Sequence, residues 1–191
     1  SHEIRTPMNG VIGIAELLEE TTLDQTQRRY VGTIIESGRA LLTIINDVLD
    51  LSKLQAAKFD LASEPFSLAD CVARAVELLR PSAQKKGLAL SMQLPDDIPL
   101  HLGDAGRLRQ ILLNLLGNAV KFTARGEVSV TLSCMGDGKG DQLRIAVTDT
   151  GIGIAPDRVG QVFDSFAQAD ATISRKFGGT GLGLAISRKF C

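Results

Sequence analysis

Apolar residues in the first fifty positions recur every three or four residues, which is the spacing of one face of a helix. The two rows are Ile4, Met8, Val11, Ala15 and Leu18, and then Val31, Ile35, Gly38, Leu42, Ile45 and Leu49. A polar break at 21–24 separates them, and Thr22 with Gln25 fits a capping box that would start the second helix. The pattern therefore predicts a helical hairpin over residues 1–57.

A further apolar row lies beside the first one on the second predicted helix, at Ile34, Leu41 and Val48. Such a wide stripe cannot be buried by one partner helix. Two hairpins that pair into a four-helix bundle would bury it, so the pattern favours a homodimer formed through the hairpin. A monomeric hairpin that packs on the rest of the chain is the alternative.

Residues 58–191 mix helical and strand patterns. They predict an extended stretch at 59–65, helices at 67–86, 104–122 and 157–163, strands at 88–94, 128–134 and 143–147, a hairpin loop at 135–141 and a last helix from about Gly181. Ser67 and Gly87 are the expected start and stop signals of the first of these helices. Since no strict βαβ repeat occurs, we expect an α/β sandwich, with a mixed sheet and helices on one face, and an α+β class for the whole chain.

Composition narrows the partners and the compartment. Lys and Arg number 21 against 22 Asp and Glu, so no basic surface for nucleic acid is expected. No apolar run reaches the roughly 18 residues of a membrane helix, which predicts a soluble, cytoplasmic fragment without membrane contact, and leaves open a membrane-anchored parent. Three widely spaced cysteines fit a reducing compartment and form no zinc pattern.

A polar stripe follows the predicted helix 104–122. At about 100° per residue its members share an arc of roughly 80°, and they are Arg107, Gln110, Asn114, Asn118 and Lys121. Two asparagines inside one helix cost helix propensity, and no acidic residue interrupts the arc. Amide oxygens and cations suit a Mg²⁺–phosphate group. A plain solvent-exposed face is the alternative.

Asp149 has the same strand parity as Leu143, Ile145 and Val147, so it is predicted to point inward. A buried carboxylate needs a donor, and the exocyclic amine of adenine would be one. Gly151 and Gly153 would let the backbone approach the ring. The alternative is an aspartate that caps the following turn.

Glycines also lead into the last predicted helix, where backbone N–H groups and the helix dipole would cradle phosphate. The residues are Gly179, Thr180, Gly181, Leu182 and Gly183. The segment is not a Walker A loop, because no Lys–Ser/Thr pair follows, and a flexible hinge is the alternative. Phe163 and Phe166, with the polar stretch 168–176, predict a lid over the ligand or, alternatively, a mobile surface loop.

The first residues place a histidine beside an acid. Glu3 would accept a proton from His2 or orient its ring, and Thr6 lies one turn further along. Pro7 is expected to bend this helix. A histidine alone is more often a solvated residue, and these neighbours favour a reactive one.

These segments resemble, in their order, the motifs of bacterial sensor histidine kinases. Residues 1–7 resemble the H box, 114–123 the N box, 149–153 the G1 box, 163–166 the F box and 179–183 the G2 box. Any one box is weak evidence, whereas five in order are specific. Segments 166–170 and 175–180 are similar to the hybrid subgroup, whose members carry an added receiver domain.

The resemblance implies a role for each residue. His2 would accept the γ-phosphoryl group of ATP, with Glu3 as base or ring orienter, and Thr6 would assist dephosphorylation of the regulator. Asn114 and Asn118 would hold Mg²⁺, with Arg107 and Lys121 near the phosphates. Asp149 would read adenine, and the remaining nucleotide contacts would be Gly151, Gly153, Gly179, Thr180, Gly181, Leu182 and Gly183.

The implied activity is that of an ATP-dependent protein histidine kinase that passes its phosphate to an aspartate of a response regulator receiver domain, and a phosphatase activity on the regulator is left open. The family has further strands after the last helix, so residues 58–191 are expected to be an ATP-binding domain that is incomplete at its C-terminus. The family's first helix also begins well before the histidine. Two rival functions remain, an ATP-driven clamp of the gyrase and chaperone type and a non-catalytic dimeric scaffold.

Overall fold

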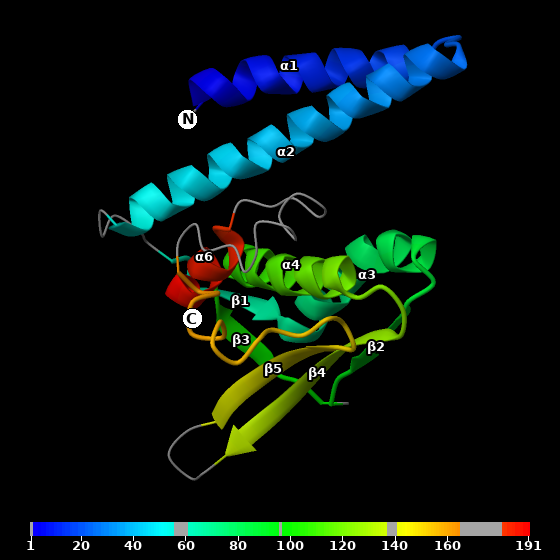
Figure 1. The fold of residues 1–191 in the computed structure, drawn as a ribbon. Helices are drawn as coiled ribbons and strands as arrows, with labels where there is room; N and C mark the ends of the chain where they lie inside the picture. Colours follow the sequence, from blue (N-terminus) through cyan, green and yellow to red (C-terminus); the bar gives the residue numbers. More distant parts are fainter. Residues whose placement is uncertain (1, 56–60, 96, 137–140, 165–180) are drawn as a thin grey trace. The chain divides into compact units, whose positions relative to one another are not determined.

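The computed structural model describes residues 2–55, 61–95, 97–136, 141–164 and 181–191 (Figure 1). The chain divides into two compact units, Ser1–Phe59 and Asp60–Cys191.

The first unit is the predicted helical hairpin, made of α1 (His2–Glu19) and α2 (Gln25–Gln55). The capping box that starts α2 is formed by Asp24 and Gln27. The Gln27 N–H donates to Asp24 Oδ1 over 2.8 Å, and the Asp24 N–H donates to Gln27 Oε1 over 3.0 Å. The predicted box at Thr22 and Gln25 is therefore wrong by two residues. Aspartate is the stronger cap, because its charge also interacts with the positive end of the helix.

The two helices meet through small and β-branched residues. Val31, Ile35 and Gly38 of α2 are buried as predicted, and Ile12 of α1 lies over Gly38, where an added Cβ would be 2.8 Å from Ile12 Cγ1. The row predicted on α1 is only partly correct. Ala15 is buried, but Ile4, Val11 and Leu18 are exposed. Ile12 fills the contact instead, because Gly38 leaves room for its side chain.

The apolar surface that α1 and α2 do not cover is large. Exposed members are Ile4, Val11, Ile14, Leu17, Leu18, Tyr30, Ile34, Leu41, Ile44 and Val48. They include the whole second row predicted on α2. A single hairpin therefore leaves this row uncovered, as its width indicated.

The second unit contains two small sheets. The three-stranded sheet has the order β2 (Ala89–Gln93), β4 (Glu127–Gly136) and β5 (Asp141–Asp149), with β2 parallel and β5 antiparallel to β4. β1 (Glu64–Ser67) and β3 (Leu100–Gly103) form an antiparallel pair. The mixed sheet is confirmed, whereas β3 was not predicted, because four residues are too few to show an alternation.

Helices α3 (Leu68–Lys85) and α4 (Ala105–Phe122) lie on one face of the three-stranded sheet, and α6 (Gly183–Phe190) packs beside α4 (Figure 1). Helices α3 and α4 share a core with β4, and its buried residues are Leu68, Cys71, Val72, Ala75, Val76, Ala83, Leu88, Leu112, Leu116, Ala119, Val120, Val128, Val130 and Leu132. The signals that bound α3 are confirmed. Ser67 Oγ accepts from the Asp70 N–H over 3.1 Å, and Gly87 has a φ of 68°.

One predicted helix does not form. Residues 157–163 are a series of turns, held by separate bonds such as Arg158 N–H to Ala155 O and Gln161 N–H to Arg158 O. Gly160 in the middle of this short segment adds to the entropic cost of a continuous helix. The last helix begins at Gly183, two residues after the predicted start.

Candidate functional site

The orientation of α4 is fixed at its first turn. Asp104 Oδ1 accepts from the Arg107 N–H over 3.0 Å, and Oδ2 accepts from the Ala62 N–H over 3.3 Å. These backbone donors, that of Arg107 first, hold the pKa of Asp104 below its usual value. With Leu112 and Leu116 turned into the core, the polar stripe is left half-buried along the side of the helix.

The first half of the stripe contacts α6. Asn114 Nδ2 lies 3.2 Å from Gly183 O and 3.4 Å from Ser187 Oγ, and the buried Ser187 hydroxyl donates to Gly183 O over 2.9 Å. The Arg107 guanidinium carbon is 5.0 Å from the centre of the Phe190 ring. Asn114 and Arg107 therefore position the helix that follows the glycine segment. This use of the stripe was missed, because nothing in the sequence shows which helix packs on α4.

The second half of the stripe lies at the other end of α4. Asn118 and Lys121 are half-buried there, and Lys121 Nζ is 4.8 Å from the centre of the Phe122 ring. Burial lowers the pKa of Lys121, since it disfavours the charged form. An anion bound beside this ammonium group would offset that cost.

Asp149 ends β5 next to the end of α4. Cross-strand pairing of Val128 with Asp149 puts the carboxylate on the same sheet face as the buried valines, as the parity predicted. The prediction that it is buried is wrong, because Asp149 is exposed. β5 ends at Asp149 and α4 ends at Phe122, so the covered face of the sheet opens to solvent at this point.

The turn after Asp149 approaches α4 closely. The Gly151 N–H donates to Asp149 Oδ1 over 2.9 Å, so the alternative of a turn-capping aspartate is observed. A Cβ at Gly151 would stand 2.7 Å from Phe122 O and 2.8 Å from Asp149 Oδ1. Only glycine fits this contact without a shift. The close approach observed at Gly151 is to the carbonyl end of α4, whereas the predicted approach was to the adenine ring. Gly153 is left-handed, with a φ of 68°.

The start of α6 offers backbone donors. Gly181 has a φ of 69°, and the N-cap position is taken by Leu182, which is buried and supplies no side-chain hydrogen bond. The N-cap residue of α6 therefore supplies no side-chain cap to the first N–H groups of the helix. Gly183 is pressed against Asn114, because a Cβ there would be 3.2 Å from Asn114 Cγ. Gly179 and Thr180 lie outside the residues that the structure describes.

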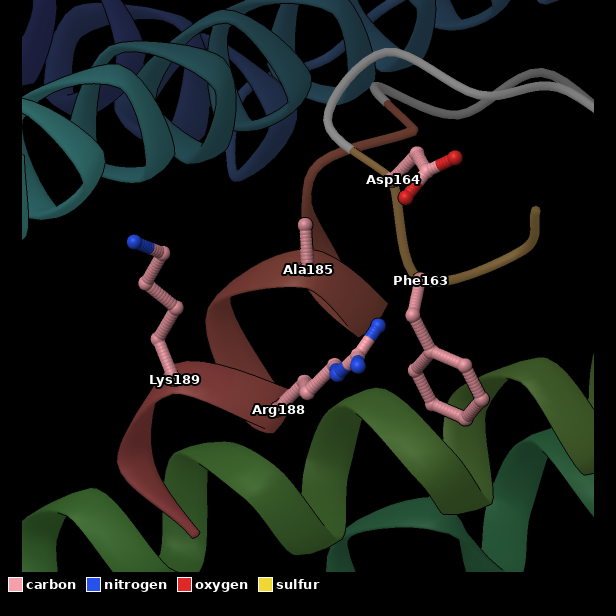
Figure 2. Close-up of a pocket in the computed structure, with 5 residues that line it drawn as sticks. All are labelled: Phe163, Asp164, Ala185, Arg188 and Lys189. Atoms are coloured by element: carbon pink, nitrogen blue, oxygen red, sulfur yellow. The ribbon is translucent and has the colours of Figure 1, made fainter. Parts of the chain in front are cut away.

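An open pocket of about 350 Å³ lies beside α6, lined by Phe163, Asp164, Ala185, Arg188 and Lys189. Figure 2 shows Arg188 beside Phe163, with its guanidinium carbon 5.9 Å from the ring centre. None of the predicted nucleotide residues lines this pocket, so it is not assigned to the nucleotide. Phe166 and the polar stretch 168–176 of the predicted lid are outside the described ranges.

The histidine segment lies at the start of α1 in the first unit. Glu3 and Thr6 are exposed, and Pro7 lies within the helix. Arg5 Nη2 donates to Asn46 Oδ1 over 3.0 Å, which links the start of α1 to α2. For His2 the structure describes the backbone alone.

Within the described part of the chain, no three His, Cys, Asp or Glu side chains gather as metal ligands. A cation near α4 would therefore take amide oxygens and oxygens of its own ligand. Among those same residues, no helix has the length and apolar character needed to cross a lipid bilayer.

Two family descriptions match the chain in order. Residues 1–57 match the His Kinase A (phospho-acceptor) domain, and residues 103–191 match the histidine kinase-, DNA gyrase B-, and HSP90-like ATPase family. The second match includes α4, the Asp149 turn and α6. It places residues 103–191 in an ATPase-like family that includes histidine kinases.

Curated relatives cover the same span. The chain is 47% identical over 192 residues to the signal transduction histidine-protein kinase BarA of Escherichia coli K12, which covers 99% of this chain and 21% of BarA. It is 45% identical over 193 residues to hybrid signal transduction histidine kinase L of Dictyostelium discoideum, covering 99% of this chain and 11% of that protein. The chain therefore spans about a fifth or less of these relatives.

Solved structures share the fold. Full-length ShkA in complex with AMPPNP has a TM-score of 0.78 at 45% identity, over 98% of this chain and 38% of that one. ThkA in complex with the response regulator protein TrrA has a TM-score of 0.64 at 23% identity, over 100% of this chain and 52% of that one, and shows the fold alone. With a phospho-acceptor domain followed by an ATPase domain, and with hybrid kinases among its relatives, the chain belongs to the sensor histidine kinase family.

Proposed function

We propose that this chain is the catalytic core of a sensor histidine kinase, which phosphorylates His2 with ATP and passes the phosphoryl group to an aspartate of a response regulator receiver domain. The observation that carries the proposal is one chain that holds both the His2 helix and an ATPase-family unit with a half-buried polar stripe beside the Asp149 turn. Residues 1–57 would be the phosphotransfer domain and residues 58–191 the ATP-binding domain.

The residues around the end of α4 suit a nucleotide. Asp149 has one oxygen engaged by Gly151, and the other has no partner in the described part of the chain, so it can accept from the adenine amine. Burial destabilises the charged form of Lys121, and a nearby phosphate would stabilise it again. Gly151 and Gly153 would let the backbone approach the adenine ring. Backbone N–H groups at Gly181, Leu182 and Gly183 would bind the phosphates. Gly179 and Thr180, which lie outside the described residues, are proposed to do the same.

Mg²⁺ would be held by amide oxygens of Asn118 and Asn114, together with phosphate oxygens. The contacts of Asn114 with α6 engage its amide nitrogen, which leaves Oδ1 for a cation. Hard cations prefer such oxygens. When bound, the ion would neutralise charge on the phosphates. Arg107, although it contacts Phe190, would add positive charge on the same side of α4.

Two phosphoryl transfers are proposed at the start of α1. An imidazole nitrogen of His2 would bond to the γ-phosphorus while the bond from that phosphorus to the β-bridging oxygen breaks and ADP leaves. Glu3 would take the proton that the other ring nitrogen loses. In the second reaction an aspartate oxygen of the regulator displaces His2 from phosphorus, and Thr6 would position the water in any dephosphorylation of that regulator.

The exposed row of Ile34, Leu41 and Val48 supports a homodimer through the hairpin, because a second copy would cover it. A response regulator partner is proposed by analogy with ThkA. We also propose a cytoplasmic location, because the buried Cys71 is a free thiol and the reaction consumes ATP.

The test is incubation with γ-labelled ATP and Mg²⁺. We expect an acid-labile label that is lost in His2→Gln and kept in His101→Gln, which changes the chain's other histidine. Asp149→Asn should weaken ATP binding and labelling together. ATP binding without any label, in this chain and in a version extended before His2, would instead support a clamp-type ATPase. Absence of ATP binding would support the scaffold.

A further inference from the structure

The last turn of α4 ends in carbonyl groups that the helix itself cannot satisfy. The final helical bond runs from the Thr123 N–H to Ala119 O, at 3.0 Å. Beyond it, Lys86 Nζ donates to Val120 O and to Lys121 O, both at 2.8 Å, and lies 3.4 Å from Thr123 O. One ammonium group thus serves three carbonyls of this turn.

The remaining carbonyl of the turn, Phe122 O, is bound by the segment that follows Asp149. The Ile152 N–H lies 3.4 Å from Phe122 O, and Gly151 stands so close that an added Cβ would meet the same oxygen at 2.7 Å. The Asp149 turn therefore rests directly on the carbonyl end of α4. Any movement of that end would move the turn with it.

Lys86 is well placed to fix this end. Its backbone is the C-cap of α3, where its N–H donates to Ala83 O and Gly87 then turns the chain with a φ of 68°. An ammonium group has three donors, and a cation at a helix C-terminus is favoured by the dipole. The side chain thereby joins the carbonyl end of α3 to the carbonyl end of α4.

We infer that Lys86 is a positioning residue for nucleotide binding. It touches none of the side chains proposed to contact the nucleotide, but through backbone carbonyls it holds the turn of α4 that carries Lys121 and supports the Asp149 turn. This inference rests on the proposed function. Without the ammonium group, Val120 O and Lys121 O would need water as their hydrogen-bond donor. The last turn of α4 would then be held less firmly, and the contact between Gly151 and Phe122 O would loosen.

The test measures the affinity of the whole 191-residue chain for ATP with Mg²⁺ by calorimetry, at a temperature where circular dichroism shows every variant folded. Lys86→Met should weaken binding about tenfold, the scale expected of a small misplacement of binding groups. Lys86→Arg, which keeps charge and donors, should recover most of the affinity. Lys86→Gln should be intermediate, so the test stands even if Lys86→Met does not fold.

Two controls separate positioning from stability. Lys85→Met changes the exposed neighbouring lysine and should leave affinity unchanged. Ser67→Ala removes the N-cap of α3 and should lower the unfolding temperature while sparing affinity. Equal affinities of Lys86→Met and the unsubstituted chain would overturn this inference alone. An unsubstituted chain that binds no nucleotide would overturn the proposed function and, with it, this inference.

Discussion

Gly151→Ala tests how closely the Asp149 turn lies against α4. The added Cβ would be 2.7 Å from Phe122 O, 3.0 Å from Phe122 C and 2.8 Å from Asp149 Oδ1. Two of these three atoms are backbone, so the methyl group cannot be accommodated by a side-chain rotation. The turn must move away from the helix, and the bond from the Ile152 N–H to Phe122 O lengthens from 3.4 Å.

The magnitude follows from two opposing terms. Gly151 is not in the left-handed region, so alanine is allowed there and would by itself stabilise the fold by about 0.4–1 kcal/mol through the unfolded chain. Forcing a methyl group into an occupied space costs about 1–3 kcal/mol. We expect a net loss of about 1–2 kcal/mol of unfolding free energy, together with weaker ATP binding.

Gly117→Ala is the matched control for this change. It lies inside α4, and apart from its chain neighbours and the backbone of its own helix, no heavy atom of the described residues comes within 4 Å of its added Cβ. Helix propensity then predicts a gain of about 0.5–1 kcal/mol. Urea unfolding measures the change in unfolding free energy of each variant, which should be a loss for Gly151→Ala and a gain for Gly117→Ala. Calorimetry with ATP measures the affinity. A Gly151→Ala variant as stable as the Gly117→Ala variant would refute the close contact.

Two further predictions concern the ends of α4. Backbone donors hold the pKa of Asp104 below its usual 3.8, so its stabilising effect is complete above about pH 5 and is lost as pH falls through the lowered folded-state pKa. Asp104→Asn should therefore flatten the fall in urea stability as the pH is lowered from about 5, and parallel curves for the two proteins would contradict this. Thr123 Oγ1 is buried without a hydrogen-bond partner in the part of the chain described, so Thr123→Val should add roughly 1 kcal/mol of unfolding free energy. Thr123→Ser should lower it by a similar amount through the lost methyl group, and a serine variant more stable than the valine variant would contradict the reasoning.

The features predicted correctly from the sequence are those decided within one turn of the chain. Ser67 caps α3, Gly87 ends it, and Asp104 precedes α4, because each acts on neighbours three or four residues away. The capping box failed for a related reason. Thr22 with Gln25 and Asp24 with Gln27 are overlapping matches to one signal, and the stronger cap decided between them.

The features that sequence analysis missed depend on distant contacts. β3 is a strand because β1 lies beside it, and the exposure of Asp149 depends on where α4 ends. Asn114 binds residues of α6 that are 69 and 73 positions away. Lys86 reaches carbonyls 34 to 37 positions away, and no motif marks it. Motif spacing therefore identified the stripe on α4, but it did not show that Asn114 and Arg107 contact α6.

The parallel pairing of β2 with β4 has a consequence for how the chain acquires its structure. α1 and α2 can form against each other across a short turn, whereas β2 pairs at Ala89–Gln93 with partners at Glu127–Thr131. Closing so long a segment before any pairing is gained slows folding. The hairpin should therefore reach its native contacts before the sheet does. During synthesis, the backbone of β2 waits without its partner until β3, α4 and the start of β4 have all emerged from the ribosome.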